Sequence, residues 1–213
     1  MKLFLDTADV KEVTKRFETG LISGITTNPT LIKRSGEEPL TVYKELTDLG
    51  VPDISMEVVA DTADEMYYMG MNLAETFPTV STIKLPCSVE GLKACTLLST
   101  HRIKTNVTLI FSPAQAILAS LAGATYISPF IGRMDDNSLD GIKLINDITN
   151  TIADGTQVLA ASIRDPQSVS IAFAVGAHIC TIPPSVFDKM YQHVLTDAGI
   201  KQFNKDNERP TTT

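Results

Sequence analysis

The strongest constraint on the fold of this chain is a regular alternation of short β-prone runs with longer helical patterns. The expected strands are Leu3–Asp6, Gly24–Asn28, Ile54–Val59, Thr82–Pro86, Asn106–Phe111, Tyr126–Ile131, Gln157–Ile163 and Ile179–Pro183. Apolar residues at helical spacing mark the segments between and after them, Val10–Phe17, Leu40–Leu49, Ala63–Glu75, Val89–Ser99, Pro113–Leu121, Leu139–Ile152, Pro166–Val175 and Ser185–Val194. Eight strands alternating with eight helices predict an α/β fold, a single closed (β/α)8 TIM barrel.

The alternative α/β architecture is a doubly wound open sheet. Such sheets often carry a Gly-x-Gly-x-x-Gly turn or a phosphate loop ending in Gly-Lys-Ser/Thr, and neither motif occurs in this sequence. The 213 residues fit one domain, and we expect residues 1–213 to form it, with 204–213 as a polar C-terminal tail. Ser112-Pro113 and Asp165-Pro166 predict helix starts, and Gly123 and Gly176 predict helix ends.

Charge and cysteine content limit the partners and cofactors. A formal net charge of −7 argues against a broad nucleic-acid surface, so the basic groups for an anionic ligand must be local. The odd set Cys87, Cys95 and Cys180 predicts reduced thiols, and without a His-x-x-x-His or Cys/His cluster no metal or other cofactor is indicated. The start of the sequence does not resemble a signal peptide and no run approaches the length of a membrane span, so we expect a cytoplasmic protein without membrane partners.

Polar side chains interrupt the expected strands near their carboxyl ends, where buried parallel strands are normally almost continuously apolar. These residues are Asp6, Thr26, Asn28, Glu57, Lys84, Asn106, Thr108, Ser128, Ser162 and Arg164. Capping of a strand end could account for one such residue, but it does not easily account for polar residues at the ends of seven strands. Because the carboxyl ends of barrel strands converge on one mouth, the pattern predicts a shared pocket there.

Lys84 lies in the β-prone segment Ser81–Pro86, which ends at a proline. One interpretation is a lysine inside a barrel, where desolvation disfavours the charged form and yields an amine that attacks a carbonyl. The other is an edge-strand lysine that prevents aggregation. Arg133 and Arg164 also have two interpretations of equal weight. They form a phosphate-binding pair helped by the Ser162 hydroxyl, or they are two surface arginines. A lysine with two carboxylates and no metal fits Schiff-base carbon–carbon chemistry.

The sequence resembles the transaldolase family, within its group of short-chain transaldolases and fructose-6-phosphate aldolases. The resemblance covers nearly the whole chain. It rests on LFLDTA at 3–8, GITTNPTLI at 24–32, SMEV at 55–58, IKLP at 83–86, TNVTLIFSPAQA at 105–116, ISPFIGR at 127–133 and AASIR at 160–164. Each segment alone is modest evidence for the family, whereas seven segments in the same order, each at an expected strand end, are highly specific.

The resemblance implies a role for each matching residue. Lys84 corresponds to the Schiff-base lysine, and Asp6 to the general acid/base that helps cleave the C3–C4 bond of a ketose. Glu57 and Thr108 correspond to a pair that positions a catalytic water. The substrate-binding positions implied are Asn28, Thr30, Asn106, Ser128, Phe130, Arg133, Ser162 and Arg164. Thr30 replaces the serine common in longer relatives and keeps its hydroxyl.

Two positions distinguish the subgroups. The aldolases carry glutamine and tyrosine where this sequence has Glu57 and Phe130, so the resemblance implies a transaldolase. Such an enzyme transfers a dihydroxyacetone unit from sedoheptulose 7-phosphate or fructose 6-phosphate to an aldose phosphate, in the pentose phosphate pathway. The alternatives are a fructose-6-phosphate aldolase that releases dihydroxyacetone and a non-catalytic sugar-phosphate-binding barrel. Family members commonly form pentamers or decamers, so the resemblance also implies a homo-oligomer.

Overall fold

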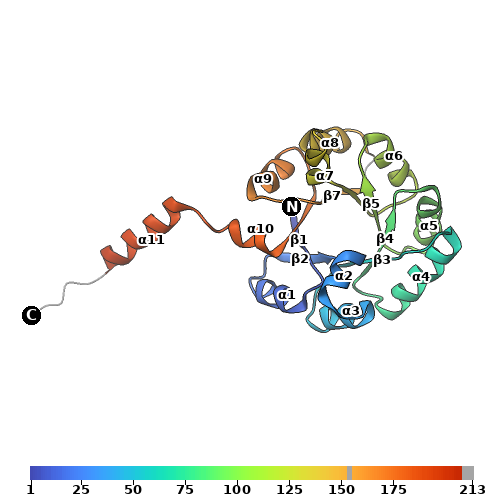
Figure 1. Ribbon diagram of the computed structural model, residues 1–213, viewed down its shortest axis with the longest axis horizontal. Coiled ribbons are helices and arrows are strands. Elements are labelled where there is room, and N and C mark those ends of the chain that lie inside the picture. The colour runs from blue at the N-terminus through green and yellow to red at the C-terminus, as the bar shows by residue number, and fades with distance from the viewer. Residues whose placement is uncertain (153–154, 208–213) are drawn as a thin grey trace, which may run out of the picture.

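The computed structural model describes residues 1–152 and 155–207, and within them eight parallel strands close into a barrel. Each strand pairs with its neighbours in sequence, and β8 pairs with β1 to close the ring. The strands are β1 Lys2–Asp6, β2 Ile22–Thr26, β3 Ile54–Glu57, β4 Ser81–Pro86, β5 Thr105–Ile110, β6 Tyr126–Pro129, β7 Gln157–Ala160 and β8 Ile179–Ile182. The predicted (β/α)8 TIM barrel is confirmed (Figure 1).

Helices surround the strand ring (Figure 1). They are α1 Val10–Phe17, α2 Pro29–Ser35, α3 Pro39–Asp48, α4 Ala63–Thr76, α5 Val89–Thr100, α6 Pro113–Leu121, α7 Ile131–Asp136, α8 Gly141–Thr149, α9 Pro166–Ala174, α10 Pro184–Lys189 and α11 Val194–Asn207. The sequence did not predict α2, α7 or α11. Helices α2 and α7 are too short to show a helical period, and α11 buries none of its residues, so it carries no core-facing stripe.

The predicted local signals at helix ends are confirmed. The Ser112 side chain accepts a hydrogen bond from the Gln115 amide, and Asp165 accepts one from the Ser168 amide, as N-caps before proline. Gly123 and Gly176 follow α6 and α9 with positive φ angles.

Several strands are shorter at the carboxyl end than predicted. The expected strand Gly24–Asn28 stops at Thr26, because Asn28 instead caps α2 by accepting a hydrogen bond from the Leu31 amide at 3.0 Å. The expected strand Gln157–Ile163 stops at Ala160, because Ser162 adopts a left-handed backbone with φ of 59°. The polar residues at these strand ends therefore lie in loops above the barrel.

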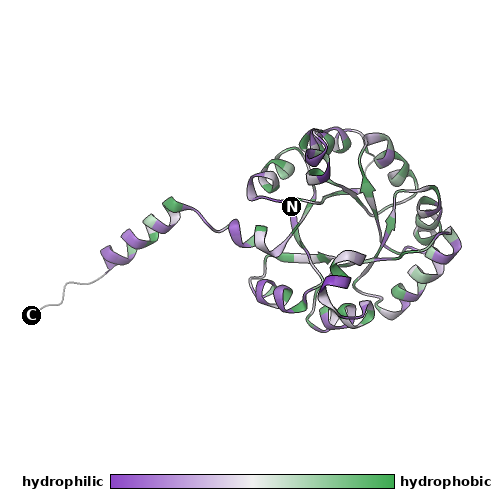
Figure 2. Cartoon of the chain, viewed as in Figure 1, coloured by the Kyte–Doolittle hydropathy of each residue, from purple (hydrophilic) through white to green (hydrophobic). Residues whose placement is uncertain are grey.

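Two apolar layers support the barrel. The larger core lies between the strands and the helices, and Figure 2 shows green, apolar residues in the strands and in parts of the surrounding helices. A second cluster contains Phe4, Tyr126, Leu159 and Ile179. Gly24 is paired with Phe4, and a Cβ atom at Gly24 would lie 2.5 Å from the Phe4 ring, so this packing requires glycine.

The C-terminal part of the chain extends away from the barrel as α11 (Figure 1). Residues 204–207 of the predicted polar tail form the last turn of this helix, and 208–213 lie outside the described residues. Among the helices of the described ranges, none has both the length and the hydropathy needed to cross a bilayer.

Candidate active site

A column of polar residues follows β3 at alternate positions. Asp53, just before the strand, accepts hydrogen bonds from Thr82 at 2.8 Å and Tyr126 at 3.0 Å and pairs with Lys104 at 2.9 Å. Further along, Ser55 accepts a hydrogen bond from the Asn106 amide at 3.1 Å. The column ends at Glu57 at the carboxyl end of the strand. Because side chains two residues apart share a face, β3 presents one polar face to its neighbours.

Lys84 lies at the upper end of this column. It is paired in register with Glu57 on β3 and Asn106 on β5, so all three share a level of the barrel. Lys84 is only 6% exposed, and its Nζ lies 3.0 Å from Glu57 Oε2. The same amine donates to the backbone carbonyl of Thr27 at 2.9 Å. The edge-strand interpretation of Lys84 is wrong, because β4 has a neighbour on each side.

Asp6 ends β1 and lines the same cavity as Lys84. Its carboxylate accepts a hydrogen bond from Thr26 Oγ1 at 2.8 Å, and Thr26 in turn contacts the Thr181 hydroxyl at 2.7 Å. Burial raises the pKa of Asp6 above its usual range, the charge of Lys84 and the bond from Thr26 oppose that rise, and Glu57 adds to it. A carboxyl group whose pKa moves toward neutrality suits proton transfer at physiological pH.

The hydroxyl and amide groups of β5 and β6 form the facing wall. Ser128 Oγ donates to Asn106 Oδ1 at 2.6 Å, so both polar atoms of the Asn106 amide are engaged within the protein. Thr108 differs, because its buried Oγ1 has no hydrogen-bond partner in the described part of the chain. Buried hydroxyls are normally satisfied, so Thr108 Oγ1 is available to a water or a substrate atom.

These side chains enclose a cavity of about 110 Å³ at the carboxyl-terminal mouth. Its lining residues are Asp6, Thr26, Asn28, Lys84, Thr108, Ser128, Phe130, Arg133, Ala161, Ser162 and Thr181. The shared pocket predicted from strand-end polarity is therefore present. The contribution of Thr181 was not predicted, although its place late in the expected strand Ile179–Pro183 extends the same pattern to the eighth strand.

The two arginines of interest have different environments. Arg133 lines the cavity, and its guanidinium lies 4.8 Å from the centroid of the Phe130 ring. Arg164 is not part of the lining and forms a two-pronged ion pair with Asp136 at the end of α7. Asp136 was not predicted as a site residue, because the ion pair joins segments that only the fold brings together.

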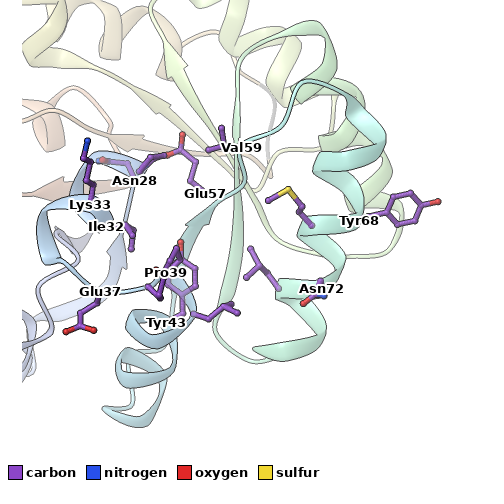
Figure 3. Close-up of a pocket in the computed structure, with 15 residues that line it drawn as sticks. Asn28, Ile32, Lys33, Glu37, Pro39, Tyr43, Glu57, Val59, Tyr68 and Asn72 are labelled. Atoms are coloured by element: carbon purple, nitrogen blue, oxygen red, sulfur yellow. The ribbon is translucent and has the colours of Figure 1, made fainter.

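A larger groove of about 820 Å³ opens between α2, α3 and α4 (Figure 3). Figure 3 shows Asn28 and Glu57 at one side of this groove and Tyr68 and Asn72, both on α4, at the other. Asn28 lines both spaces, whereas Glu57 lines the groove and reaches Lys84 from it. The groove thus borders the cavity.

Three predicted site residues lie elsewhere. Thr30 is exposed on α2 and lines neither space, Asn106 is fully buried behind Ser128, and Arg164 is held by Asp136. Across residues 1–152 and 155–207, no group of three or more His, Cys, Asp or Glu side chains gathers as a metal-binding set.

The fold and this cluster define a (β/α)8-barrel protein with a lysine–carboxylate pocket where barrel enzymes carry their active sites. The family model described as Transaldolase/Fructose-6-phosphate aldolase matches residues 3–212. The chain belongs to this family and is one of its enzymes.

Curated relatives agree with this assignment over almost their full length. A protein of Caulobacter vibrioides named "Probable transaldolase" is 51% identical, with 97% of this chain and 96% of the relative covered. Proteins of the same name from Geobacter sulfurreducens and Paracoccus denitrificans are 49% and 47% identical, covering 98% and 97% of this chain and 98% and 96% of the relatives.

Proposed function

We propose that this protein is a transaldolase that moves a dihydroxyacetone unit between sugar phosphates through a Schiff base on Lys84. The donor is sedoheptulose 7-phosphate or fructose 6-phosphate, the acceptor is an aldose phosphate, and the reaction belongs to the pentose phosphate pathway. The observation that carries the proposal is the buried Lys84 amine at the cavity wall, 3.0 Å from Glu57.

Imine formation begins when the uncharged amine of Lys84 attacks the C2 carbonyl of the ketose. Glu57 is at hydrogen-bonding distance from the amine and accepts its proton, directly or through a water held with Thr108. The carbinolamine oxygen takes up a proton from solvent, and Glu57 then returns its proton to the resulting hydroxyl group, which leaves as water and gives a cationic iminium. The carboxylates of Glu57 and Asp6 balance its charge.

Carbon–carbon cleavage follows at the C3–C4 bond. Asp6 takes the proton of the C4 hydroxyl, the aldose leaves as an aldehyde, and the bonding electrons pass into the iminium to give an enamine. For transfer, C3 of the enamine attacks the carbonyl of the acceptor, and Asp6 returns its proton to the new C4 oxygen. The raised pKa of Asp6 supports this dual role, because the group gives and takes a proton in one cycle.

Polar groups at the wall of the cavity suit the bound sugar chain. Asn28 uses its carbonyl oxygen to cap α2, and its amide nitrogen has no hydrogen-bond partner in the described ranges, so it suits a hydroxyl group of the sugar. Ser128 and Asn106 form a second set through their mutual bond, and Thr30 lies further out on α2 as a weaker candidate. Arg133 and Ser162 line the cavity, and Arg164 lies beside Ser162, so the three side chains suit the terminal phosphate.

Phe130 supports transfer over release of free dihydroxyacetone. Its ring contacts Phe111 edge-on at 5.8 Å and lies under the Arg133 guanidinium, so an apolar ring occupies a position where a phenol would deliver protons. An enamine without a nearby proton donor waits for an acceptor aldehyde. Measuring free dihydroxyacetone from fructose 6-phosphate without an acceptor tests this. A release rate equal to the transfer rate would show an aldolase instead.

Borohydride reduction with fructose 6-phosphate tests the covalent step. We expect a single adduct with the mass of reduced dihydroxyacetone on the peptide that contains Lys84. Lys104 is the internal control for the site of the adduct. Like Lys84 it forms an ion pair with a carboxylate, here Asp53, but it does not line the cavity. No adduct on Lys84 would favour the non-catalytic sugar-phosphate binder.

We also propose that the protein is a cytoplasmic homo-oligomer and that residues 1–213 form a single barrel domain with a polar tail from 204. The support is α11, which runs away from the barrel and exposes four large apolar side chains (Figure 1). These are Val194 at 78%, Leu195 at 72%, Ile200 at 52% and Phe203 at 74% exposure. A helix of this kind is covered when it packs against a second copy of the chain.

A further inference from the structure

We propose that Asp136 is a positioning residue for phosphate recognition: it holds one edge of the Arg164 guanidinium so that the other edge faces the substrate phosphate. The proposal rests on the proposed function, because it concerns how the same cavity recognises phosphorylated sugars. It adds a residue that acts through Arg164 and does not itself touch the substrate.

The pairing between the two side chains is two-pronged. Arg164 Nη1 donates to Asp136 Oδ1, and Nη2 donates to Oδ2. A guanidinium offers five N–H donors in a rigid plane and can bind one anion at its end and another at its Nε side. Asp136 occupies the end, and Arg164 Nε makes no hydrogen bond within residues 1–152 and 155–207, so this N–H group can donate to a second anion.

The Nε edge lies against Gly132, next to Ser162. A Cβ atom at Gly132 would lie 2.8 Å from Arg164 Nε and 3.1 Å from Ser162 Oγ, so both donors converge on this glycine. Ser162 lines the cavity, as does Arg133, the next residue after Gly132. The free edge of Arg164 is therefore directed toward the groups proposed to bind phosphate.

The backbone is bent to make this arrangement. Ser162 has a φ of 59°, a conformation that costs a non-glycine residue on the order of 1–3 kcal/mol. Its carbonyl accepts the Gly132 amide at 3.0 Å, which holds α7 against the loop after β7. Since Asp136 is the last residue of α7, this contact also places its carboxylate beside Arg164.

The Arg164–Asp136 pair lies at the surface, with the two side chains 56% and 48% exposed, so the neighbouring charged groups decide whether the pairing is specific. The other acidic residue nearby, Asp135, uses its carboxylate to accept the Gly141 amide, and Arg133 forms no ion pair within the described ranges. Of the two arginines, Arg164 alone is held by a carboxylate in the described ranges. The bond from Arg164 lowers the pKa of Asp136, so the carboxylate stays charged while the enzyme works.

Kinetics of Asp136→Asn test the proposal, because the change keeps the shape and removes the charge. We expect the KM for fructose 6-phosphate and the inhibition constant of inorganic phosphate to rise about fivefold to tenfold, with kcat within about twofold. The KM for unphosphorylated fructose should not change. Asp136→Glu should recover most of the loss, since it restores the charge.

Two controls separate this role from a general loss of surface charge. Asp48→Asn removes an equivalent carboxylate from the exposed Lys44–Asp48 pair and should leave every constant unchanged. Adding Asp136→Asn to Arg164→Ala should cause no further loss, because Asp136 acts through Arg164. A lower KM for fructose 6-phosphate in Asp136→Asn, an equal effect on both donors, or additive losses would overturn the proposal.

Phosphate binding separates this proposal from the proposed function. Titration calorimetry with inorganic phosphate requires no turnover, and we expect weaker binding to Asp136→Asn than to the unchanged protein. If borohydride traps no adduct, the Schiff-base proposal fails while this comparison still stands. Equal phosphate affinity in the two proteins would refute the role of Asp136 even if Lys84 forms the adduct.

Discussion

Lys84 and Glu57 occupy paired positions on adjacent strands and meet inside the barrel, with Nζ 3.0 Å from Oε2. This relationship suits the proposed reaction, because the iminium nitrogen of a Schiff base is cationic and Glu57 lies beside it. The geometry favours the charged intermediate without rearrangement of the protein, as preorganised catalytic groups do.

Replacing the proposed nucleophile should abolish covalent trapping and leave the barrel folded. In Lys84→Met we expect no borohydride adduct and no transfer. Stability should fall by about 1–3 kcal/mol, because Glu57 loses its partner in a partly buried position. Mass spectrometry and chemical denaturation measure the two effects. Lys104→Met, which breaks the ion pair with Asp53, should still form the adduct. Absence of the adduct in this variant would contradict the assignment to Lys84.

Asp6→Asn should be less active and more stable. Loss of the general acid/base should lower kcat by about 10²–10⁴-fold. Because burial raises the pKa of Asp6 in the folded state, the native protein holds a proton that the unfolded chain releases, and its stability falls as pH rises above about 3.9. Removing that group should raise stability near pH 7 by about 1 kcal/mol, or about 2–4 °C in Tm.

The pH dependence of the stability gain shows whether it comes from the raised pKa of Asp6 or from the asparagine amide itself. The stability gain of Asp6→Asn over the unchanged protein should be small near pH 4 and grow toward neutral pH. Thermal unfolding across this range measures it. A gain that stays constant or shrinks as pH rises would mean that Asp6 has no raised pKa.

Thr108→Val removes the buried hydroxyl that has no partner in the described part of the chain. The shape is nearly conserved, so we expect unchanged or slightly higher stability together with transfer about 10–100-fold slower, as imine formation or hydrolysis becomes limiting. Single-turnover trapping kinetics measure the step. Thr105→Val is the control on the same strand: Thr105 contacts Cys95 at 3.3 Å outside the cavity, and its loss should leave the rate unchanged.

Arg133→Ala should weaken phosphorylated donors selectively. It removes a charge-assisted contact at the cavity wall, so we expect the KM for fructose 6-phosphate to rise about 10-fold or more, while unphosphorylated donors are unaffected. Steady-state kinetics with both donors measure the difference. Equal losses for both would assign Arg133 to the sugar chain and not to the phosphate.

Charges in place of the exposed apolar residues of α11 should dissociate the oligomer. In the double variant Leu195→Asp and Phe203→Asp we expect the monomer mass in light scattering, because two charges cannot be buried in an apolar contact. Leu139→Asp, at an exposed site away from α11, is the control and should keep the native mass. A monomer in the unchanged protein would refute the proposed assembly.

Local sequence patterns determined most of the architecture. Alternating β-prone and helical segments predicted the closed barrel, and capping residues such as Ser112 and Asp165 predicted helix starts. The polar residues late in the strands predicted the pocket, including Lys84, because parallel barrel strands bring their carboxyl ends to one mouth. These features depend on spacing along the chain, which the sequence records directly.

The tertiary structure alone decided which of these groups touch one another. Asn28 ends a predicted strand yet caps α2, and Ser162 turns into a left-handed conformation that no local signal announced. Asp136 and Arg164 are 28 residues apart and belong to segments that meet where Ile131 and Gly132 donate to the carbonyls of Ala161 and Ser162. Pairing across the barrel depends on register, closure and side-chain contacts between distant strands, and these arise only when the whole ring is assembled.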